Sequence, residues 1–102
     1  MKVMVRSIMT TLPGKMEEAM KLEKKHTAIA NRVLGISPRI YQRLSGGGDT
    51  MRTIISEEEF DSLAAFEDHP KKMGADPEMQ ELAPKLRAVM DSVEIEFYVP
   101  MP

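Results

Sequence analysis

His26 is the side chain in this sequence best suited to acid–base chemistry. At about 100° per residue it falls within the apolar stripe of a predicted helix, and so points at the sheet that this helix should cover. The stripe consists of Ala19, Leu22, Ile29 and Val33. Imidazole changes its charge near neutral pH, so His26 could serve as a general base or as a hydrogen-bond donor to a bound molecule. The more common alternative is a core histidine that is satisfied by Ser7 or by a backbone carbonyl.

Polar side chains also interrupt the apolar rows of the predicted sheet on the side that faces this helix. They are Ser7, Gln42 and Thr53. Two hydroxyls and an amide beside an imidazole could orient a small molecule, and the chain's ten methionines could shape the cavity around it. The methionines expected there are Met9, Met16, Met20 and Met51. The sequence therefore predicts a ligand pocket between sheet and helices.

The counts of cysteine and histidine limit this chemistry. The chain has no cysteine, which excludes disulfides, thiolate metal sites and a thiol nucleophile, and two histidines exclude a three-His metal site. No spacing or motif joins His26 and His69 to a carboxylate, so we expect neither a metal nor a cofactor. His69 precedes Pro70 at a predicted helix end, where a histidine interacts favourably with the helix dipole.

Composition and charge argue against other classes of function. Fourteen Lys and Arg against sixteen Asp and Glu give a net charge of −2, without the basic excess of a nucleic-acid-binding surface. The first residues alternate in character and include Arg6, unlike a signal peptide or a membrane span, so we expect a cytoplasmic protein that does not bind membranes. With 102 residues, 42% hydrophobic and 29% charged, we expect one domain over residues 1–102.

The first half of the chain predicts a strand, a long helix and a hairpin. Residues 2–10 alternate as in a strand, and residues 12–15 lead into a helix that ends at Leu34, with Gly35 as its cap. Residues 36–45 and 50–55 alternate on either side of Gly46-Gly47-Gly48-Asp49, which predicts a β-hairpin. A phosphate-binding loop is disfavoured, because no helix start and no Lys-Ser/Thr pair comes after the glycines.

The second half predicts helices and a final strand. Ser56-Glu57-Glu58-Glu59 has the form of a capping box, which predicts a helix reaching His69 and Pro70. Asp76-Pro77-Glu78 predicts another helix start, and Pro84 should divide this helical stretch into a turn over residues 78–82 and a helix over residues 84–90. Residues 91–100 alternate as a last strand.

This order, βαββαβ, predicts an α+β fold of the ferredoxin-like type. Its four-stranded antiparallel sheet should have the order 4-1-3-2, with the helices on one face. The helix-covered face is predicted to carry Val3, Val5, Met9, Ile40, Leu44, Met51, Ile55, Val93, Ile95 and Phe97.

The opposite sheet face mixes charged and large apolar side chains. Its polar members are Arg6, Tyr41, Arg43, Arg52, Glu94, Glu96 and Tyr98, accompanied by Met4, Ile8 and Ile54. Large apolar groups would be exposed there in a monomer, so a second subunit packing on this face explains the pattern best. The alternative is a half-solvated sheet face with scattered ion pairs.

The chain resembles the dimeric α+β barrel superfamily, and within it the NIPSNAP-like and antibiotic-biosynthesis-monooxygenase-like domains. The resemblance rests on Leu12-Pro13-Gly14-Lys15 and on residues 76–94, from Asp76-Pro77-Glu78-Met79 through Pro84-Lys85-Leu86 to Ser92-Val93-Glu94. It implies a homodimer whose two sheets form a barrel, with a pocket in each subunit between sheet and helices. The haem-degrading branch uses a tryptophan, and this chain has none.

The sequence and the resemblance together predict a homodimer that binds an apolar or aromatic small molecule, one that could carry a carboxylate. If the protein is an enzyme, we expect monooxygenase-like oxidation without a cofactor, or isomerisation. His26 would then be catalytic, and Ser7, Gln42 and Thr53 would orient the ligand. The alternative is a non-enzymatic interaction or stress-associated module in which His26 is structural.

Overall fold

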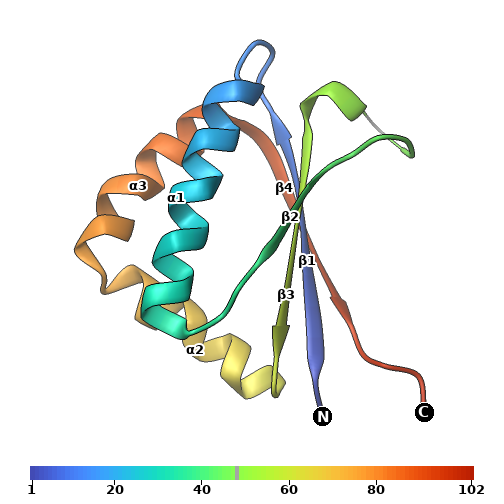
Figure 1. Ribbon diagram of the computed structural model, residues 1–102, viewed down its shortest axis with the longest axis vertical. Coiled ribbons are helices and arrows are strands. Elements are labelled where there is room, and N and C mark those ends of the chain that lie inside the picture. Colours follow the sequence, from blue (N-terminus) through green and yellow to red (C-terminus); the bar gives the residue numbers. More distant parts are fainter. Residues whose placement is uncertain (48) are drawn as a thin grey trace.

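The computed structural model describes residues 1–47 and 49–102, and builds them into a layer of helices on one face of a four-stranded sheet (Figure 1). The strands are β1 (Val3–Thr11), β2 (Arg39–Gln42), β3 (Thr53–Phe60) and β4 (Met90–Tyr98). The helices are α1 (Met16–Leu34), α2 (Leu63–Gly74) and α3 (Pro77–Val89), with a short 3-10 turn, η1 (Thr50–Arg52), before β3. The predicted α+β class is confirmed. Gly48, within the predicted glycine turn, lies outside the described residues.

The sheet has the order β2-β3-β1-β4, which confirms the predicted 4-1-3-2 arrangement. The central strand β1 pairs antiparallel with β3 on one side and with β4 on the other. Ser7 lies opposite Ser56 on β3 and opposite Ile95 on β4. Because partners across an antiparallel pair point to the same face, this register brings three strands' side chains together beneath the helices.

Helix α1 forms where the sequence predicts it. Glu17 and Glu18 lie in its first turn, where they oppose the positive end of the helix dipole. At the other end Gly35 adopts φ 69°, a left-handed conformation that favours glycine, and its N–H donates to the Asn31 carbonyl at 3.0 Å. The apolar stripe packs inward: Ala19, Leu22, Ile29 and Ala30 are buried.

The predicted helix start at Ser56 is wrong, because Ser56 to Glu59 belong to β3. These residues continue the pairing with β1, in a ladder that runs from Thr10 opposite Thr53 to Val3 opposite Phe60. Ser62 is the residue that caps α2, accepting a hydrogen bond from Ala65 N–H at 3.1 Å. The cross-strand ladder with the nine-residue β1 thus overrides a local capping pattern.

The predicted phase of β3 is inverted. Ile54 pairs with Met9 and is buried beneath the helices, whereas Ile55 pairs with Ile8 on the opposite face. Met51 lies in η1 rather than in a strand and is 71% exposed. The predicted strand over residues 36–45 shortens to β2, and Leu44, beyond its end, is also exposed. The turn η1 changes the alternation just before β3 begins.

Pro84 does not divide the third helix, which runs unbroken from Pro77 to Val89. A proline inside a helix costs about 3 kcal/mol, because it removes one backbone donor and crowds the preceding turn. Leu82 and Val89, on either side of Pro84, are buried in the main hydrophobic cluster. Their burial offsets the cost and holds the helix together. The predicted last strand is confirmed as β4 within two residues at its C-terminal end.

Ion pairs join the helices on the outside of this core. Asp76 caps α3 by accepting from Met79 N–H at 3.1 Å, and it also binds the Arg32 guanidinium through two contacts of 2.8 and 2.9 Å. The last turn of α1 is thereby tied to the first turn of α3. None of the helices among the described residues combines the length and apolar character that crossing a bilayer requires.

Candidate functional site

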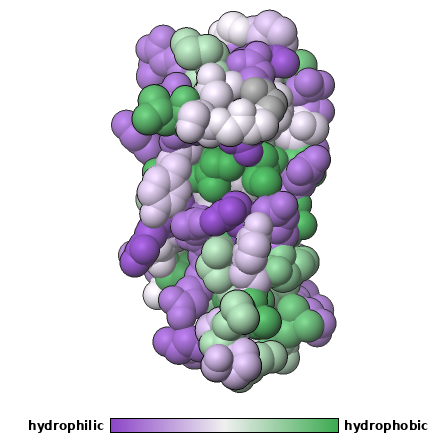
Figure 2. Space-filling model, turned by 90° about the vertical axis from the view of Figure 1, so that its right-hand side faces the viewer, coloured by the Kyte–Doolittle hydropathy of each residue, from purple (hydrophilic) through white to green (hydrophobic). Residues whose placement is uncertain are grey.

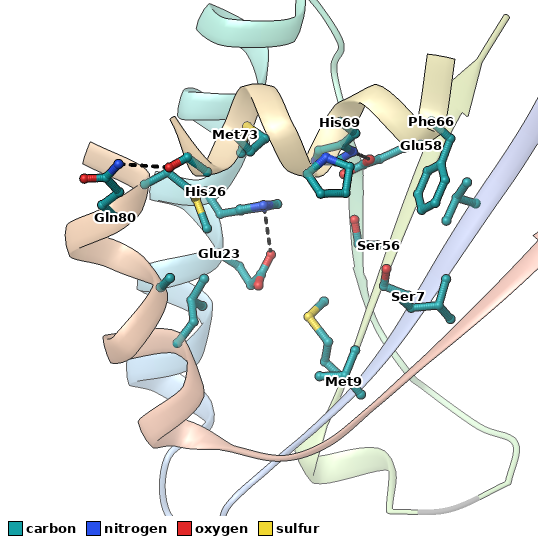
Figure 3. A pocket seen from close by; sticks show the side chains of 18 residues that line it. Ser7, Met9, Glu23, His26, Ser56, Glu58, Phe66, His69, Met73 and Gln80 are labelled. Carbon is teal, nitrogen blue, oxygen red and sulfur yellow. Dashed lines mark hydrogen bonds and ion pairs between the residues drawn. The ribbon is translucent and has the colours of Figure 1, made fainter. Parts of the chain in front are cut away.

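A cavity of about 520 Å³ lies between the helices and the sheet, where the sequence predicts a pocket (Figure 3). Its floor comes from β1, β3 and β4, and its walls come from α1, α2 and α3. The apolar lining residues are Val5, Met9, Phe66, Pro70, Met73, Gly74, Met79, Ala83, Leu86, Val93 and Ile95, and the polar ones are Ser7, Glu23, His26, Ser56, Glu58, His69 and Gln80. This size suits a molecule of a few fused rings.

Glu23 and His26 form one carboxyl–imidazole pair on α1. Their spacing of three residues puts them on the same helix face, and Nδ1 of His26 lies 3.7 Å from Oε2 of Glu23. The Glu23 side chain is only 5% exposed. Burial, and then the nearby Glu58 carboxyl, raise the pKa of Glu23 to about 7. Burial, and then His69, lower the pKa of His26, so this imidazole is neutral at physiological pH.

Glu58 and His69 form a second pair, contributed by β3 and α2. Nδ1 of His69 lies 3.6 Å from Oε2 of Glu58, whose side chain is 10% exposed. Burial raises the pKa of Glu58 to about 7 and lowers the pKa of His69. Both contacts exceed hydrogen-bond length, and the Nδ1 atoms of both histidines are buried without a hydrogen-bond partner among the described residues. The cavity therefore holds two carboxyl–imidazole pairs, and in each pair the histidine Nδ1 lacks a hydrogen bond from the described residues.

Two serine hydroxyls lie on the floor beside these pairs. Ser7 and Ser56 face each other across the β1–β3 ladder, and Figure 3 shows both on the sheet side of the cavity, across from His26 and Glu23. A hydroxyl can donate to or accept from a bound oxygen or nitrogen. Among the described residues, no Lys or Arg lines the cavity, so its formal charges come from the carboxyl and imidazole groups alone.

Two of the predicted ligand-binding residues lie elsewhere. Gln42 is at the end of the short edge strand β2, and it lines a separate hollow that it shares with Arg6 and Tyr41. Thr53 is buried at the start of β3, where its hydroxyl donates to the Asp49 carbonyl. His26 and Ser7 do line the cavity.

The predicted methionine lining is confirmed only in part. Met9 lines the cavity and Met16 packs against the core, whereas Met20 and Met51 are exposed. Met73 and Met79, from α2 and α3, line the cavity in their place.

Four polar lining residues, Glu23, Ser56, Glu58 and Gln80, are not predicted as site residues by the sequence, which places His69 at a helix end. His69 lies inside α2, before Pro70, and faces Glu58. For Glu23 a signal was available, because a glutamate three residues before His26 shares its helix face. For Glu58 and Ser56 the signal was hidden by the capping-box pattern, which assigned both to a helix.

Neither a protein-family model nor a curated protein matches the chain in sequence. Solved structures, in contrast, match its fold. A NIPSNAP family protein from Agrobacterium tumefaciens superposes with a TM-score of 0.84 at 22% identity, covering 98% of this chain and 86% of that one.

The fold is that of the NIPSNAP family proteins. A NIPSNAP domain protein from Burkholderia xenovorans gives a TM-score of 0.81 at 20% identity, covering 99% of this chain and 95% of that one. SnoaB, a cofactor-independent oxygenase from Streptomyces nogalater, gives 0.70 at 17% identity, covering 99% and 94%. The predicted resemblance is thus confirmed for the NIPSNAP and monooxygenase-like folds.

The sheet face turned away from the helices is here called the open face; it is the right-hand side of the sheet in Figure 1. Figure 2 looks onto this side and shows hydrophilic surface on it. Arg6 donates to Glu57 at 2.7 and 3.1 Å, and its guanidinium lies 5.0 Å from the centre of the Tyr98 ring. Tyr98 in turn donates to Glu96 at 2.5 Å. Figure 2 shows apolar surface interspersed with this hydrophilic surface, and the register places Ile8 and Ile55 side by side there. Arg6, Glu96 and Tyr98 therefore lie together, as predicted.

Other residues predicted for the open face lie differently. Arg52 is in η1, where it donates to Asp49 and to the Thr11 carbonyl, each at 2.9 Å. Arg43 lies beyond β2 and donates to the Gly47 carbonyl. Tyr41 pairs with Ile55, and Glu94 with Ile8, so both face the open side. Ile54 does not, because of the inverted phase of β3, and Glu57 takes a place there that was not predicted for it.

Proposed function

We propose that the protein binds an apolar, ring-bearing small molecule in the cavity and moves a proton on it, with His26 as the general base. The observation that carries this proposal is the pairing of a buried carboxyl with a neutral imidazole at two places on the wall of one apolar cavity. Buried polar groups without partners are costly to a fold. A ligand that uses them explains why they are there.

The Glu23–His26 pair has the arrangement of a base and its supporting carboxylate. Nδ1 of His26 faces Glu23, which leaves Nε2 as the ring nitrogen available to a ligand. A proton that passes from an acidic C–H or O–H group of the ligand to Nε2 converts the ring to imidazolium. The Glu23 carboxylate beside Nδ1 stabilises that cation, and the Ser7 and Ser56 hydroxyls can donate to the ligand oxygen that gains negative charge.

The Glu58–His69 pair supplies a second proton-transfer group on the same cavity. With a pKa of about 7, Glu58 is partly protonated near neutral pH and can deliver a proton. Removal at one point and delivery at another is an isomerisation. Removal alone leaves an electron-rich ligand, the species that could react with dioxygen in a cofactor-independent oxygenase, the activity named for the Streptomyces protein. Both reactions share the step assigned to His26.

Hydrogen–deuterium exchange of 1-tetralone, an apolar bicyclic ketone, tests this step. Followed by NMR in D₂O, the exchange of its α-hydrogens should be faster with the protein than in buffer. His26→Gln should reduce the protein-dependent rate by roughly a hundredfold, the usual scale of a general base. Gln42→Ala, outside the cavity, is the matched control and should leave the rate unchanged. Exchange no faster than in buffer, or an unaltered rate for His26→Gln, would contradict the proposal and favour a structural His26.

The same proposal includes a homodimer formed through the open face. Apolar side chains there, including Ile8 and Ile55, lie on a sheet face that the helices leave uncovered. Arg6 is paired with Glu57, and Tyr98 donates to Glu96, so these groups keep their hydrogen bonds when a second sheet covers them. Light scattering should give twice the chain mass, and Ile55→Glu should give a monomer. A monomeric parent protein at micromolar concentration would contradict this part.

A further inference from the structure

One corner of the cavity is built differently from the rest. Glu58, His69 and Phe66 meet there, and Figure 3 shows them grouped on the side away from Glu23 and Met9. The Phe66 ring packs edge-on against Phe60 at 5.4 Å and against Phe97 at 5.0 Å between centroids. His69 lies within this aromatic group, 6.1 Å from the Phe66 ring centre. A carboxyl group is therefore held against an aromatic wall.

The Glu58 carboxyl has no cationic partner among the described residues of this corner. Its side chain is nine-tenths buried, and Nδ1 of His69 lies 3.6 Å from its Oε2. The other titratable groups that line the cavity are Glu23 and His26, and no Lys or Arg of the described chain joins them. Buried carboxylates are ordinarily paired with a cation or fully hydrogen-bonded. When the carboxyl is ionised, a positive charge on a ligand would supply the partner that it lacks.

We propose that the corner formed by Glu58, His69 and Phe66 binds a protonated amine, so that the ligand of the cavity is an apolar molecule bearing one basic nitrogen. This inference rests on the proposed function, whose ligand it specifies. With such a ligand Glu58 is the counter-ion of the ammonium, so proton removal by His26 is retained and proton delivery by Glu58 is not. An ammonium group donates to the Glu58 carboxylate, and the face of an aromatic ring attracts the same cation. The Glu58 carboxyl and the Phe66 ring line the same cavity, and both side chains are already in place.

The apolar body of such a ligand has a surface to lie on. Val93 and Ile95 line the cavity from the edge strand β4, and each is 53% exposed although it points to the helix side of the sheet. Phe97 continues this row and contacts Phe66. A hydrocarbon or ring system that extends from the Glu58 corner along β4 would bury this exposed apolar surface.

The same charges disfavour the other classes of ligand. A carboxylate-bearing ligand, which the sequence allows, would meet two carboxyl groups and no counter-charge from the described residues. Arg6, which could have served an anion, lies on the open face and is held by Glu57. Within residues 1–47 and 49–102, no three His, Cys, Asp or Glu side chains gather as metal ligands, so the positive charge is assigned to the organic ligand itself.

Three probes with one ring system separate these classes: 2-(1-naphthyl)ethylamine, 2-(1-naphthyl)ethanol and 1-naphthylacetate. In calorimetric titrations at about pH 7, the amine should bind roughly tenfold more tightly than the alcohol, the scale of one charge-assisted hydrogen bond, and the carboxylate should bind most weakly. Glu58→Gln should remove the advantage of the amine over the alcohol. The matched control is Glu59→Gln, on the same strand but the opposite face, which should alter neither.

Proton release gives a readout that a merely structural Glu58 would not produce. At about pH 6 Glu58 is protonated, and a bound ammonium must displace that proton, so the binding enthalpy of the amine should depend on the buffer's ionisation enthalpy. The alcohol should release none. Equal binding of amine and alcohol would overturn the amine site while leaving the proposed cavity function intact. Failure of all three probes to bind would overturn both, and tightest binding by the carboxylate would overturn the amine site alone.

Discussion

Glu57 and Glu58 are neighbours on β3, yet they meet opposite surroundings. Glu57 points to the open face and accepts two hydrogen bonds from Arg6, at 2.7 and 3.1 Å. The hydrogen bond to Glu57 raises the pKa of Arg6, as expected for a cation held by a carboxylate. Glu58 points to the cavity, where burial raises its pKa to about 7. Glu57 is paired with a cationic side chain of the protein, whereas Glu58 has no cationic partner among the described residues.

This difference supports the proposal that the open face serves assembly and that the cavity serves binding. The open face carries the Arg6–Glu57 ion pair, which is satisfied within the subunit and tolerates coverage by a second subunit. The cavity is lined by two carboxyl–imidazole pairs. In each pair the histidine Nδ1 is buried and has no hydrogen-bond partner among the described residues. A fold gains nothing in stability from such groups, so their presence points to a ligand.

The largest expected effect compares Ile54 with Ile55. Ile54 is 1% exposed beneath the helices, so Ile54→Ala should lower the free energy of unfolding by about 4 kcal/mol, the upper half of the range for a buried isoleucine. Ile55→Ala, on the open face, should lower it much less and should instead weaken dimerisation. Urea denaturation at two protein concentrations measures both. Equal losses of stability at the two positions would contradict the assignment of faces.

The next effect compares Glu58→Gln with Glu57→Gln as the pH changes. The folded protein holds the Glu58 proton up to about pH 7, whereas the unfolded chain releases it near the ordinary value of 4.5. The resulting stability is fully present below pH 4.5 and is lost as the pH rises through about 7, a change of about 3 kcal/mol. As the pH rises from about 4.5 to about 8, the free energy of unfolding of Glu58→Gln should therefore increase by about 3 kcal/mol relative to that of the parent protein.

Glu57→Gln is the control for this experiment, since it removes an ion pair rather than an unpaired acid. His69, whose pKa is lowered by burial, contributes the opposite slope, because its share of stability is lost as the pH falls below the ordinary histidine value. Because Glu58 lies 3.6 Å from His69, an NMR titration of His69 in each variant gives the slope to subtract. A Glu58→Gln difference that stays constant across this range would mean that Glu58 is ionised in the folded protein.

The smallest effect concerns salt. Glu57→Gln should destabilise the protein by about 0.5 kcal/mol at low ionic strength, because the Arg6–Glu57 pair is partly exposed. In about 1 M sodium chloride this cost should shrink towards zero, since salt screens surface charges. The effect of Glu58→Gln should not change with salt, because it reflects burial. Equal salt sensitivity of the two variants would remove the distinction between the faces.

Much of the fold could be predicted because its signals are local. The alternation over residues 2–10 and 91–100, the cap at Gly35 and the start at Asp76 each depend on a few adjacent residues, and each is confirmed. The sheet order then comes from the element order. The sequence predictions fail where strand pairing, rather than the local pattern, decides between helix and strand. Ser56 and Glu59 fit a helix cap as well as a strand, and only the ladder with β1 distinguishes the two.

The residues of the candidate site could likewise be predicted only where local patterns place them. His26 and Ser7 come from the helical and strand periods, and both line the cavity. Glu58 could not be found, because its place depends on the register of β3, which the local pattern conceals. Gln42 pairs with Ile54, as a residue of the helix-covered face should, but β2 is a short edge strand that lies away from the cavity.

The central claim is that two carboxyl groups lie in the cavity without a cationic partner from the described residues. A ¹³C NMR titration of the Glu23 and Glu58 carboxyl carbons measures this directly. We predict that both groups titrate near pH 7, and that 2-(1-naphthyl)ethylamine lowers the Glu58 midpoint. Midpoints close to the ordinary glutamate value, about 4.3, for both carboxyls would contradict the account, because they would show that water or a cation already reaches them.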